Sequence, residues 1–398
     1  MKILYYSPHP YLNLSSPSGP GTHMREMIRG FREEGHEVAV CILGGEHIYG
    51  NINFNFGNTG IKGKIKSLIP DILWQTVKDF NLQFKDKAAG KSLEKVIEDF
   101  QPDLIYERGF YMMTSGVKIA NQLGIPHILE MNAPFPEEKI ELEGKTWLKG
   151  KSEKLERIQA EGTNMMVVVS SGLKNYYESK YQALKGKVLV TPNAIDPNNF
   201  LVDPAETSAL REELGILQDD VVIGFVGSIF PYHGVKDLLL SFGELCENIP
   251  TKNIKLLIVG DGETLPELKR IAANSSWNQQ VIFTGNIPYT SVKSYIANMD
   301  ITVLANSKWY CSPIKIFEYG ALNKAIVSIN TTAVQDVMIN GEDGILIDEP
   351  KKDLRDALGQ LIENEPLRSQ FAQSFHDKVL TKHTWNAMAK LIITTFKS

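Results

Sequence analysis

Short apolar segments recur along the whole chain, and most of them run into a loop of small or charged residues and then into a helical pattern. Continuous apolar strands of this kind are typical of parallel sheets that helices cover on both faces. The repeated order of strand, loop and helix predicts an α/β fold with ligand sites at the carboxyl ends of the strands. The predicted strands are 2–7, 37–43, 102–108, 124–132, 164–170, 187–190, 221–228, 255–259, 281–283, 301–305 and 325–329.

The chain has 398 residues, which is enough for two domains of ordinary size. A turn rich in Pro and Asn, residues 191–196, follows a full set of strand and helix units, and such a turn is typical of a linker. We therefore expect two doubly wound domains, residues 1–198 and 199–376.

Composition and charge argue against some classes of ligand and location. A net charge of −5 and a pI near 6.0 argue against nucleic acid, which needs a basic face. Cys41, Cys246 and Cys311 are far apart and lack C-x-x-C spacing, so we expect a reducing cytoplasm and no zinc site. The amino terminus shows no signal-peptide pattern and no apolar run reaches membrane-spanning length, so we expect a cytoplasmic protein whose membrane contact, if any, is peripheral.

The stretch from residue 312 to 329 carries the clearest chemistry. Ser312 is predicted to cap a helix with Pro313 at its first position, and a buried strand follows at 325–329. The first N–H groups of a helix have no partner within it, and the helix dipole favours anions there. Lys315 adds a positive charge, and Glu318 on nearly the same face can accept two hydroxyl hydrogen bonds, which together suggest phosphate and a diol, as in a nucleotide. The predicted core residues of this helix are Ile314, Phe317 and Ala321.

At these residues the chain resembles the retaining glycosyltransferases of family 4, which have the two-domain GT-B fold of facing Rossmann-like domains. The resemblance implies that Glu318 holds the ribose of a nucleotide-sugar and that Ser312, Pro313 and Ile314 lie on its diphosphate. The family usually has a second glutamate eight residues earlier, where this chain has Tyr310. The alternative for this stretch is a capped helix packed on a strand.

Two further positions depart from the family pattern. Ser228 stands where the family has arginine, and His233 stands where it has lysine. In the family, that arginine and that lysine bind the diphosphate. We expect neutral or protonated His233 to donate to phosphate, and Lys315 to supply the missing charge, so that Lys315→Ala reduces turnover more than His233→Ala. The resemblance also implies donor contacts from Gly227, Gly260, Asp261, Gly262, Asn286 and Ile287.

In the first half, the loop 18–22 is expected to lie at the mouth of the sheet. The resemblance implies that its Gly19 and Gly21 lie near the donor phosphates and the acceptor; the alternative is a flexible loop tip. A helix follows, with Met24, Met27, Ile28 and Phe31 at core spacing.

Charged residues end two strands of the first half. Arg108, which stands where the family often has an active-site histidine, and Glu130 are predicted to point at the ligand crevice with Glu107. The alternative is a structural ion-pair cluster, and His127 is expected to be a core or edge residue. Arg108, Glu130, His233 and Lys315 form our predicted catalytic set, with no metal and no cofactor, since a nucleotide-sugar would be a substrate.

Residues 62–84 have a different character. The spacing of apolar residues predicts an amphipathic helix. Its start carries Lys62, Lys64 and Lys66, and Trp74 lies beside its apolar face. Such a segment can lie on an anionic membrane or receive a lipid tail, and the alternative is an ordinary core stripe. Its apolar face comprises Ile65, Leu68, Ile69, Ile72, Leu73, Thr76, Phe80 and Phe84.

The resemblance covers almost the whole chain. It implies transfer of a sugar from a UDP- or GDP-linked donor, bound to the second domain, to a glycan or glycolipid acceptor that enters from the first, with domain closure and with residues 377–398 crossing back onto the first domain. Family habit suggests bacterial surface polysaccharide synthesis. The alternatives are a nonhydrolysing sugar-nucleotide epimerase and a catalytically silent partner that binds nucleotide-sugar.

Overall fold

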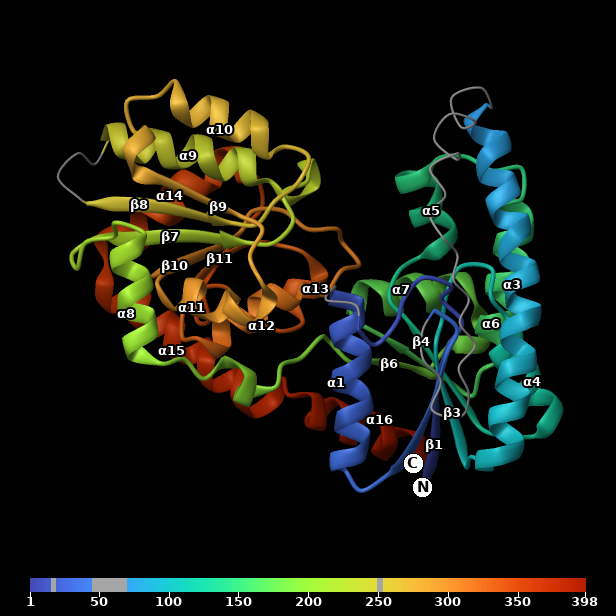
Figure 1. The fold of residues 1–398 in the computed structure, drawn as a ribbon. Coiled ribbons are helices and arrows are strands. Elements are labelled where there is room, and N and C mark those ends of the chain that lie inside the picture. The colour runs from blue at the N-terminus through green and yellow to red at the C-terminus, as the bar shows by residue number, and fades with distance from the viewer. Residues whose placement is uncertain (16–18, 45–69, 249–252) are drawn as a thin grey trace. The chain divides into compact units, whose positions relative to one another are not determined.

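The computed structural model describes residues 1–15, 19–44, 70–248 and 253–398. The chain forms two compact units, Met1–Thr191 with Trp385–Ser398, and Pro192–Thr384 (Figure 1). The division falls between Thr191 and Pro192, so all of the turn at 191–196 except its first residue belongs to the second unit and not to the first. The return to the first unit takes place at residue 385, later than the expected 377, and involves only the last helix.

The first unit is built on a six-stranded parallel sheet with the order β2-β1-β3-β4-β5-β6. Each strand coincides with an apolar segment predicted from the sequence, because a strand covered on both faces must be apolar on both faces. The strands are β1 (Lys2–Ser7), β2 (Glu37–Ile42), β3 (Leu104–Arg108), β4 (His127–Met131), β5 (Met165–Val168) and β6 (Val188–Val190).

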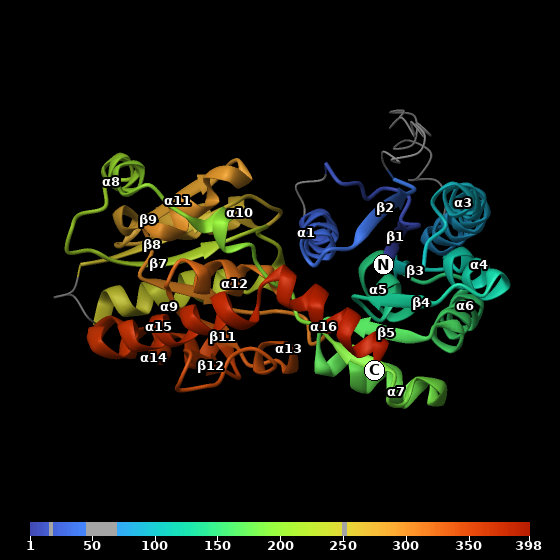
Figure 2. The same cartoon turned by 90° about the horizontal axis from the view of Figure 1, so that it is seen from below.

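Helices cover both faces of this sheet. Figure 2 shows α3, α4 and α6 along one face and α1 and α16 along the other. Helix α1 packs closely on α16, since a Cβ atom at Gly30 would lie 2.8 Å from the carbonyl oxygen of Trp385. The helices are α1 (Gly19–Glu33), α3 (Asp71–Phe100), α4 (Ser115–Leu123), α5 (Phe135–Glu143), α6 (Lys149–Gly162), α7 (Ser171–Lys180) and α16 (Trp385–Lys397).

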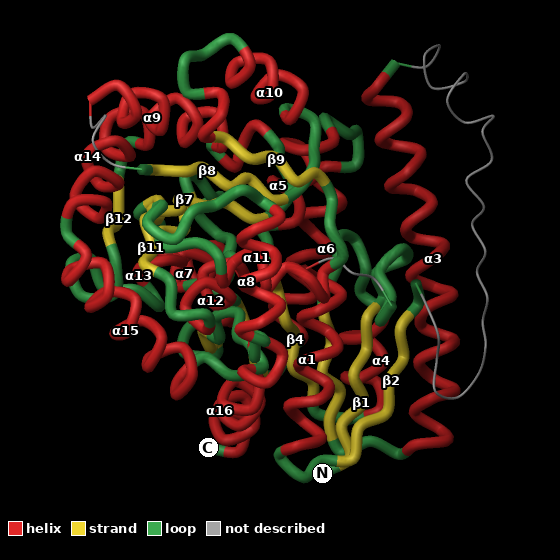
Figure 3. The backbone as a smooth tube through the Cα atoms, turned by 60° about the vertical axis from the view of Figure 1, so that its left-hand side comes forward, coloured by secondary structure: helices red, strands yellow, loops and turns green. Residues whose placement is uncertain are grey.

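The second unit repeats the plan with a six-stranded parallel sheet of order β12-β11-β10-β7-β8-β9. Its strands lie between helices, as the yellow and red segments of Figure 3 show. The strands are β7 (Val221–Val226), β8 (Ile254–Val259), β9 (Val281–Gly285), β10 (Ile301–Leu304), β11 (Ala325–Ile329) and β12 (Ile345–Ile347). The helices are α8 (Pro204–Glu213), α9 (Val235–Asn248), α10 (Leu265–Ala273), α11 (Val292–Ala297), α12 (Ile314–Ala321), α13 (Thr332–Gln335), α14 (Pro350–Glu363) and α15 (Glu365–Lys382).

Both strand orders reverse at one point, between β1 and β3 in the first unit and between β7 and β10 in the second. The loops that leave the two strands at such a point diverge to opposite faces and open a crevice, where doubly wound folds bind ligands. The loops after these strands are therefore the expected place of a ligand site. In the parts of the chain that the structure describes, every helix is too short or too polar to cross a membrane.

Candidate active site

Helix α12 begins one residue later than the sequence suggested. Pro313 occupies the N-cap position with φ −77° and ψ 116°, and the helix starts at Ile314. The prediction that Ser312 caps this helix is wrong, because its hydroxyl accepts a hydrogen bond from the Asn193 backbone N–H at 3.0 Å. The Asn193 side chain also donates to the Ser312 carbonyl at 2.5 Å, so the turn at 192–196 anchors the start of α12.

The inward face of α12 agrees with the prediction at two of its three positions. Phe317 and Ala321 are buried as expected, whereas Ile314 is only half-buried and Ile316 is fully buried in its stead. The hydroxyl of Tyr319 accepts a hydrogen bond from the Val226 backbone N–H, the last residue of β7, at 3.0 Å. This bond joins the middle of α12 to the strand at the switch point and so positions Lys315 and Glu318 there.

Lys315 lies against the turn that follows β7. Its Nζ atom is 4.3 Å from the centroid of the Phe225 ring, which gives a cation–π contact. Gly227 has φ 137°, a conformation that favours glycine, and a Cβ atom there would lie 2.9 Å from Nζ. Burial lowers the pKa of Lys315 to about 8, with Glu318 opposing the shift. The site thus holds a poorly solvated cation beside a glycine turn, an arrangement that favours a bound anion.

Glu318 follows on the same helix and is 6% exposed. The hydroxyl of Tyr289, which is 44% exposed, donates a hydrogen bond to its Oε1 atom at 2.9 Å. Burial raises the pKa of Glu318, while the hydrogen bond from Tyr289 and the charge of Lys315 lower it. Tyr289 was not found from the sequence; its only signal was its place just after the predicted donor contact Ile287.

The two glycine-bearing loops after β7 and β8 cross each other closely. The Gly227 N–H donates to the Val259 carbonyl at 2.9 Å, and the Ile229 N–H donates to the Asp261 carbonyl at 2.9 Å. A Cβ atom at Gly260, where φ is 131°, would lie 2.1 Å from the Gly227 carbonyl oxygen. A Cβ atom at Gly262 would lie 2.5 Å from the Ile229 carbonyl oxygen, so these glycines have a packing role whatever they bind.

His233 is half-buried beside Lys315, and its Nδ1 atom lies 2.5 Å from the Ser228 carbonyl oxygen. A carbonyl only accepts, so the ring proton of neutral His233 is on Nδ1, and Nε2 is then an acceptor. Burial, and then the charge of Lys315, lower the pKa of His233 to about 4. The expectation that neutral His233 donates to phosphate does not fit this geometry, because its one ring proton is directed at the Ser228 carbonyl.

The remaining predicted donor contacts vary in exposure. Ser228, Asp261 and Asn286 are exposed at the same sheet edge, and Ile287 packs partly into the core. Tyr310, which stands at the family's glutamate position, is fully buried and packs against Trp309 with ring centroids 5.3 Å apart. The second unit therefore brings Lys315, Glu318 and the loops after β7, β8 and β9 together at one edge.

In the first unit, Glu130 receives several donors at the end of β4. Tyr106 donates to Oε2 at 2.7 Å, Asn132 donates to Oε1 at 2.6 Å, and Arg108 pairs with Oε1. His23 of α1 lies 3.1 Å from Oε2. Burial alone would raise the pKa of Glu130, but His23 and Arg108 lower it well below its usual range. Glu130 is therefore an ionised anchor that orients Arg108 and His23.

Glu107 does not join this group, contrary to the sequence-based expectation. Successive side chains of a strand point to opposite faces, so Glu107 and Arg108 lie on different sides of the sheet. Glu107 is fully buried with His127, whose Nε2 atom is 2.9 Å from Oε2. The prediction that His127 is a core residue is confirmed, since its Nδ1 atom also contacts Thr163.

His9 is a further residue that the sequence analysis missed. It follows β1 at the switch point of the first sheet, and its ring centroid is 4.0 Å from that of Phe110, which follows β3. The Tyr11 N–H donates to Nδ1 at 3.1 Å, and burial, then Arg108, lower the pKa of His9 to about 4. Its signal in the sequence was its place just after the first strand.

The predicted loop at 18–22 is only partly described. Residues 16–18 lie outside the described residues, and Gly19 and Gly21 belong to the first turn of α1 rather than to a loop. Of the segment 62–84, residues 62–69 also lie outside the described residues, and the remainder belongs to α3.

Comparison with known proteins places both units. The model of group 1 glycosyl transferases matches residues 206–376, and the model of glycosyltransferase family 4 matches residues 17–199. The lipopolysaccharide 1,2-N-acetylglucosaminetransferase of Salmonella typhimurium is 26% identical over 237 residues, which cover 56% of this chain and 60% of that protein. The capsular polysaccharide biosynthesis glycosyltransferase CapM of Staphylococcus aureus is 25% identical over 244 residues, covering 58% of this chain and 62% of CapM. The alignments thus span less than two thirds of either relative.

A solved structure shares the fold over the full length. The crystal structure of Anabaena HepE in complex with UDP superposes with a TM-score of 0.73 at 15% identity and covers 100% of both chains. At this identity the likeness concerns the fold. Since the two family models together account for both units, the chain belongs to the family 4 type of GT-B glycosyltransferases.

Proposed function

We propose that the protein transfers a sugar from a UDP- or GDP-linked donor to a glycan or glycolipid acceptor with retention of configuration. The observation that carries this proposal is the placement of Lys315 and Glu318 on α12, at the switch point of the second sheet. HepE, which shares the fold, was solved with UDP, and this supports a nucleotide-diphosphate donor.

Each group at this edge has a distinct task in the proposal. The first amides of α12 and the Lys315 ammonium hold the diphosphate, since the start of a helix is positive and the Lys315 charge is poorly solvated. The Glu318 carboxylate accepts hydrogen bonds from the ribose hydroxyls, with Tyr289 keeping one of its oxygens in place. Nε2 of neutral His233 is an acceptor. It therefore accepts a hydrogen bond from a hydroxyl group of the nucleotide-sugar and makes no hydrogen bond to the phosphates.

The proposed step needs no protein nucleophile. The bond between the sugar C1 and the diphosphate oxygen breaks, and the acceptor oxygen bonds C1 on the same face. The acceptor proton passes to the departing diphosphate oxygen, so atoms and charge balance. Negative charge develops on the leaving group, and Lys315 together with the α12 amides stabilises it. Arg108, which pairs with Glu130, remains in the proposed catalytic set as a second positively charged residue.

The acceptor is proposed from the relatives. The Salmonella and Staphylococcus proteins are named for lipopolysaccharide and for capsular polysaccharide biosynthesis. We propose a bacterial surface glycan or its lipid-linked precursor as acceptor, and a cytoplasmic location where nucleotide-sugars are made.

A nucleotide-release panel tests the proposal. The purified full chain is incubated with UDP- and GDP-sugars, with and without a lipid-linked glycan extract, and Lys315→Met serves as the matched control. Acceptor-dependent release of UDP or GDP, with an anomeric centre of unchanged configuration by NMR, is expected. A free sugar-nucleotide isomer without acceptor would instead identify an epimerase, and binding of donor without turnover would identify a silent partner.

The pH dependence of the reaction follows from Lys315. Because its pKa is lowered to about 8, the free protein loses this charge as the pH rises through that value. We expect kcat/KM for the donor, which reports the free protein, to fall above about pH 8. Lys315→Met lacks the group that titrates, so its residual kcat/KM should show no such falling limb. An unchanged limb in the variant would assign it to another group.

A further inference from the structure

The first half of α3 has its polar and apolar sides reversed. Gln75, Thr76 and Asp79 are buried, although polar side chains of a surface helix normally face water. The apolar side chains on the other side are exposed, by 37% for Leu73, 55% for Val77, 48% for Phe80 and 74% for Phe84. The spacing of these four residues puts them on one helical face. The predicted apolar face contained Leu73, Phe80 and Phe84, but it also contained Thr76, which is buried, and it lacked Val77. The alternative of an ordinary core stripe is wrong for the exposed apolar residues of α3.

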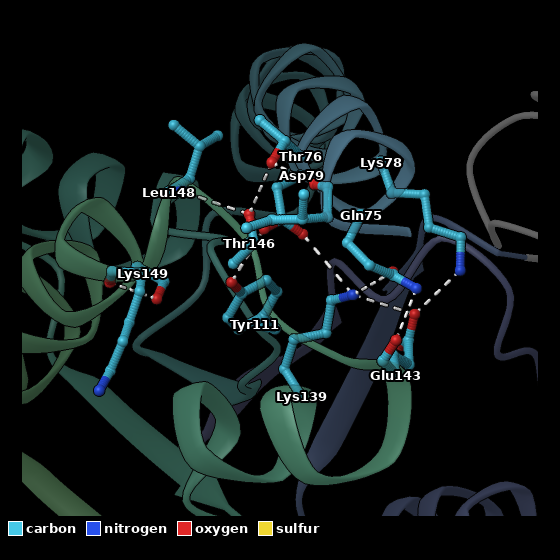
Figure 4. A network of polar contacts seen from close by, with 12 residues as sticks. Gln75, Thr76, Lys78, Asp79, Tyr111, Lys139, Glu143, Thr146, Leu148 and Lys149 are labelled. Carbon is cyan, nitrogen blue, oxygen red and sulfur yellow. Dashed lines mark hydrogen bonds and ion pairs between the residues drawn. The ribbon is translucent and has the colours of Figure 1, made fainter. Parts of the chain in front are cut away.

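The inward polar side is fixed by partners from α5 and its neighbours, as Figure 4 shows. Lys139 Nζ donates to Gln75 Oε1 at 2.7 Å, and Gln75 Nε2 donates to the Glu143 carbonyl at 2.6 Å. The hydroxyl of Tyr111 donates to Asp79 Oδ2 at 3.2 Å. Turning the helix to bury its apolar side would break these hydrogen bonds, so they hold the apolar face outward.

A basic segment lies beside this face. The Trp147 N–H donates to Thr76 Oγ1 at 3.0 Å, and the Trp147 side chain is 65% exposed. Lys151 Nζ lies 5.9 Å from the centroid of the Phe80 ring. Residues 145–154 contain four lysines, Lys145, Lys149, Lys151 and Lys154, and a single acidic residue, Glu153.

We propose that this surface, the α3 face formed by Leu73, Val77, Phe80, Phe84 and Trp147, docks onto the surface of an anionic phospholipid bilayer. The four aligned side chains of α3 extend over about 16 Å of helix, enough to lie flat in the interface. Exposed Phe and Trp partition into the headgroup region, and flanking lysines attract anionic lipid while their stems lie along the apolar surface. Charge complementarity favours this occupant over a neutral protein groove.

The inference is independent of the proposed sugar transfer, because it concerns neither α12 nor its loops. It would place the protein at the membrane whatever reaction it catalyses. Residues 45–69 lie outside the described residues and form no part of the α3 face as defined here.

Cosedimentation of the full chain with vesicles tests this inference. We expect binding to vesicles of phosphatidylcholine with phosphatidylglycerol and little binding to phosphatidylcholine alone. Phe84→Ser should lower the partition coefficient about tenfold, from the loss of one buried aromatic side chain. The matched control is Leu123→Ser, which removes a half-exposed apolar side chain from α4 in the same unit and should leave binding unchanged.

The charges have a test of their own. Lys149→Ala and Lys151→Ala should each lower the partition coefficient up to about fivefold at low salt, and less at high salt. Equal recovery with neutral and anionic vesicles, or no binding to either, would overturn the proposal. So would a lowered melting temperature of Phe84→Ser with unchanged vesicle binding, since the α3 face would then be covered by protein. Turnover of Phe84→Ser with a water-soluble acceptor is expected to match wild type, which separates this result from failure of the proposed function.

Discussion

Lys315→Met is expected to lower kcat for sugar transfer about 10²- to 10³-fold, the loss typical of removing one preorganised group that stabilises developing negative charge. Methionine keeps an unbranched chain that can lie on Phe225 and beside Gly227 but carries no charge. Steady-state release of UDP or GDP, measured with saturating donor and acceptor, gives the comparison.

The stability of this variant separates a functional role from a structural one. The pKa of Lys315 is lowered by burial, so its charged form is disfavoured in the folded protein. Between about pH 8 and the ordinary pKa of lysine the unfolded chain binds more protons, and stability therefore rises with pH there. At neutral pH the poorly solvated charge of half-buried Lys315 opposes folding, so Lys315→Met should melt no earlier than wild type.

His233→Ala provides the matched comparison. Neutral His233 presents an acceptor and not a charge, so its loss should reduce kcat about tenfold at most, the value of one ordinary hydrogen bond. A larger loss for His233→Ala than for Lys315→Met would contradict the compensation of the missing family cations by Lys315.

The second large effect is expected at Glu318. Glu318→Gln should raise KM for the donor about 10- to 100-fold with a smaller change in kcat, because a charged hydrogen bond to the ribose is lost equally in ground state and transition state. Isothermal titration with UDP and with GDP, which have the ribose but lack the transferred sugar, checks that the loss of affinity concerns the nucleotide.

Two controls accompany this variant. Burial raises the pKa of Glu318, so its ionised form is disfavoured in the folded protein above the ordinary pKa of glutamate, and the neutral amide should not lower the melting temperature. Tyr289→Phe removes only the hydroxyl that orients Oε1 and should raise KM less than Glu318→Gln. Unchanged affinity of Glu318→Gln for UDP and GDP would remove Glu318 from the nucleotide site.

The strands were predictable because a strand in a covered parallel sheet must be apolar on both faces, and this requirement is local. Strand β12 was missed, although β6, which also has three residues, was predicted. The prediction that Glu107 and Arg108 point into the same crevice was wrong. Neighbouring side chains of a strand point to opposite faces, so the sequence alone would have separated these two residues.

The residues of the site were likewise predictable only where their chemistry is local in the sequence. Lys315 and Glu318 were found because their chemistry lies within one helix turn of each other. Ser312 was misread because its hydroxyl is taken by Asn193, which is 119 residues away along the chain. Tyr289 and His9 become neighbours of other site groups only when loops that follow separate strands meet at one edge of a sheet.

The sequence by itself determined eleven of the twelve described strands, the helix that bears Lys315 and Glu318, and most of the apolar face of α3, since each depends on the spacing of neighbouring residues. Only the tertiary structure decided that Nε2 of His233 is an acceptor and that the stripe of α3 faces outward. Both outcomes depend on hydrogen-bond partners brought by folding, the Ser228 carbonyl for His233 and the groups around Lys139 and Glu143 for α3. A buried polar group must find such a partner, and its identity is set by packing between distant segments.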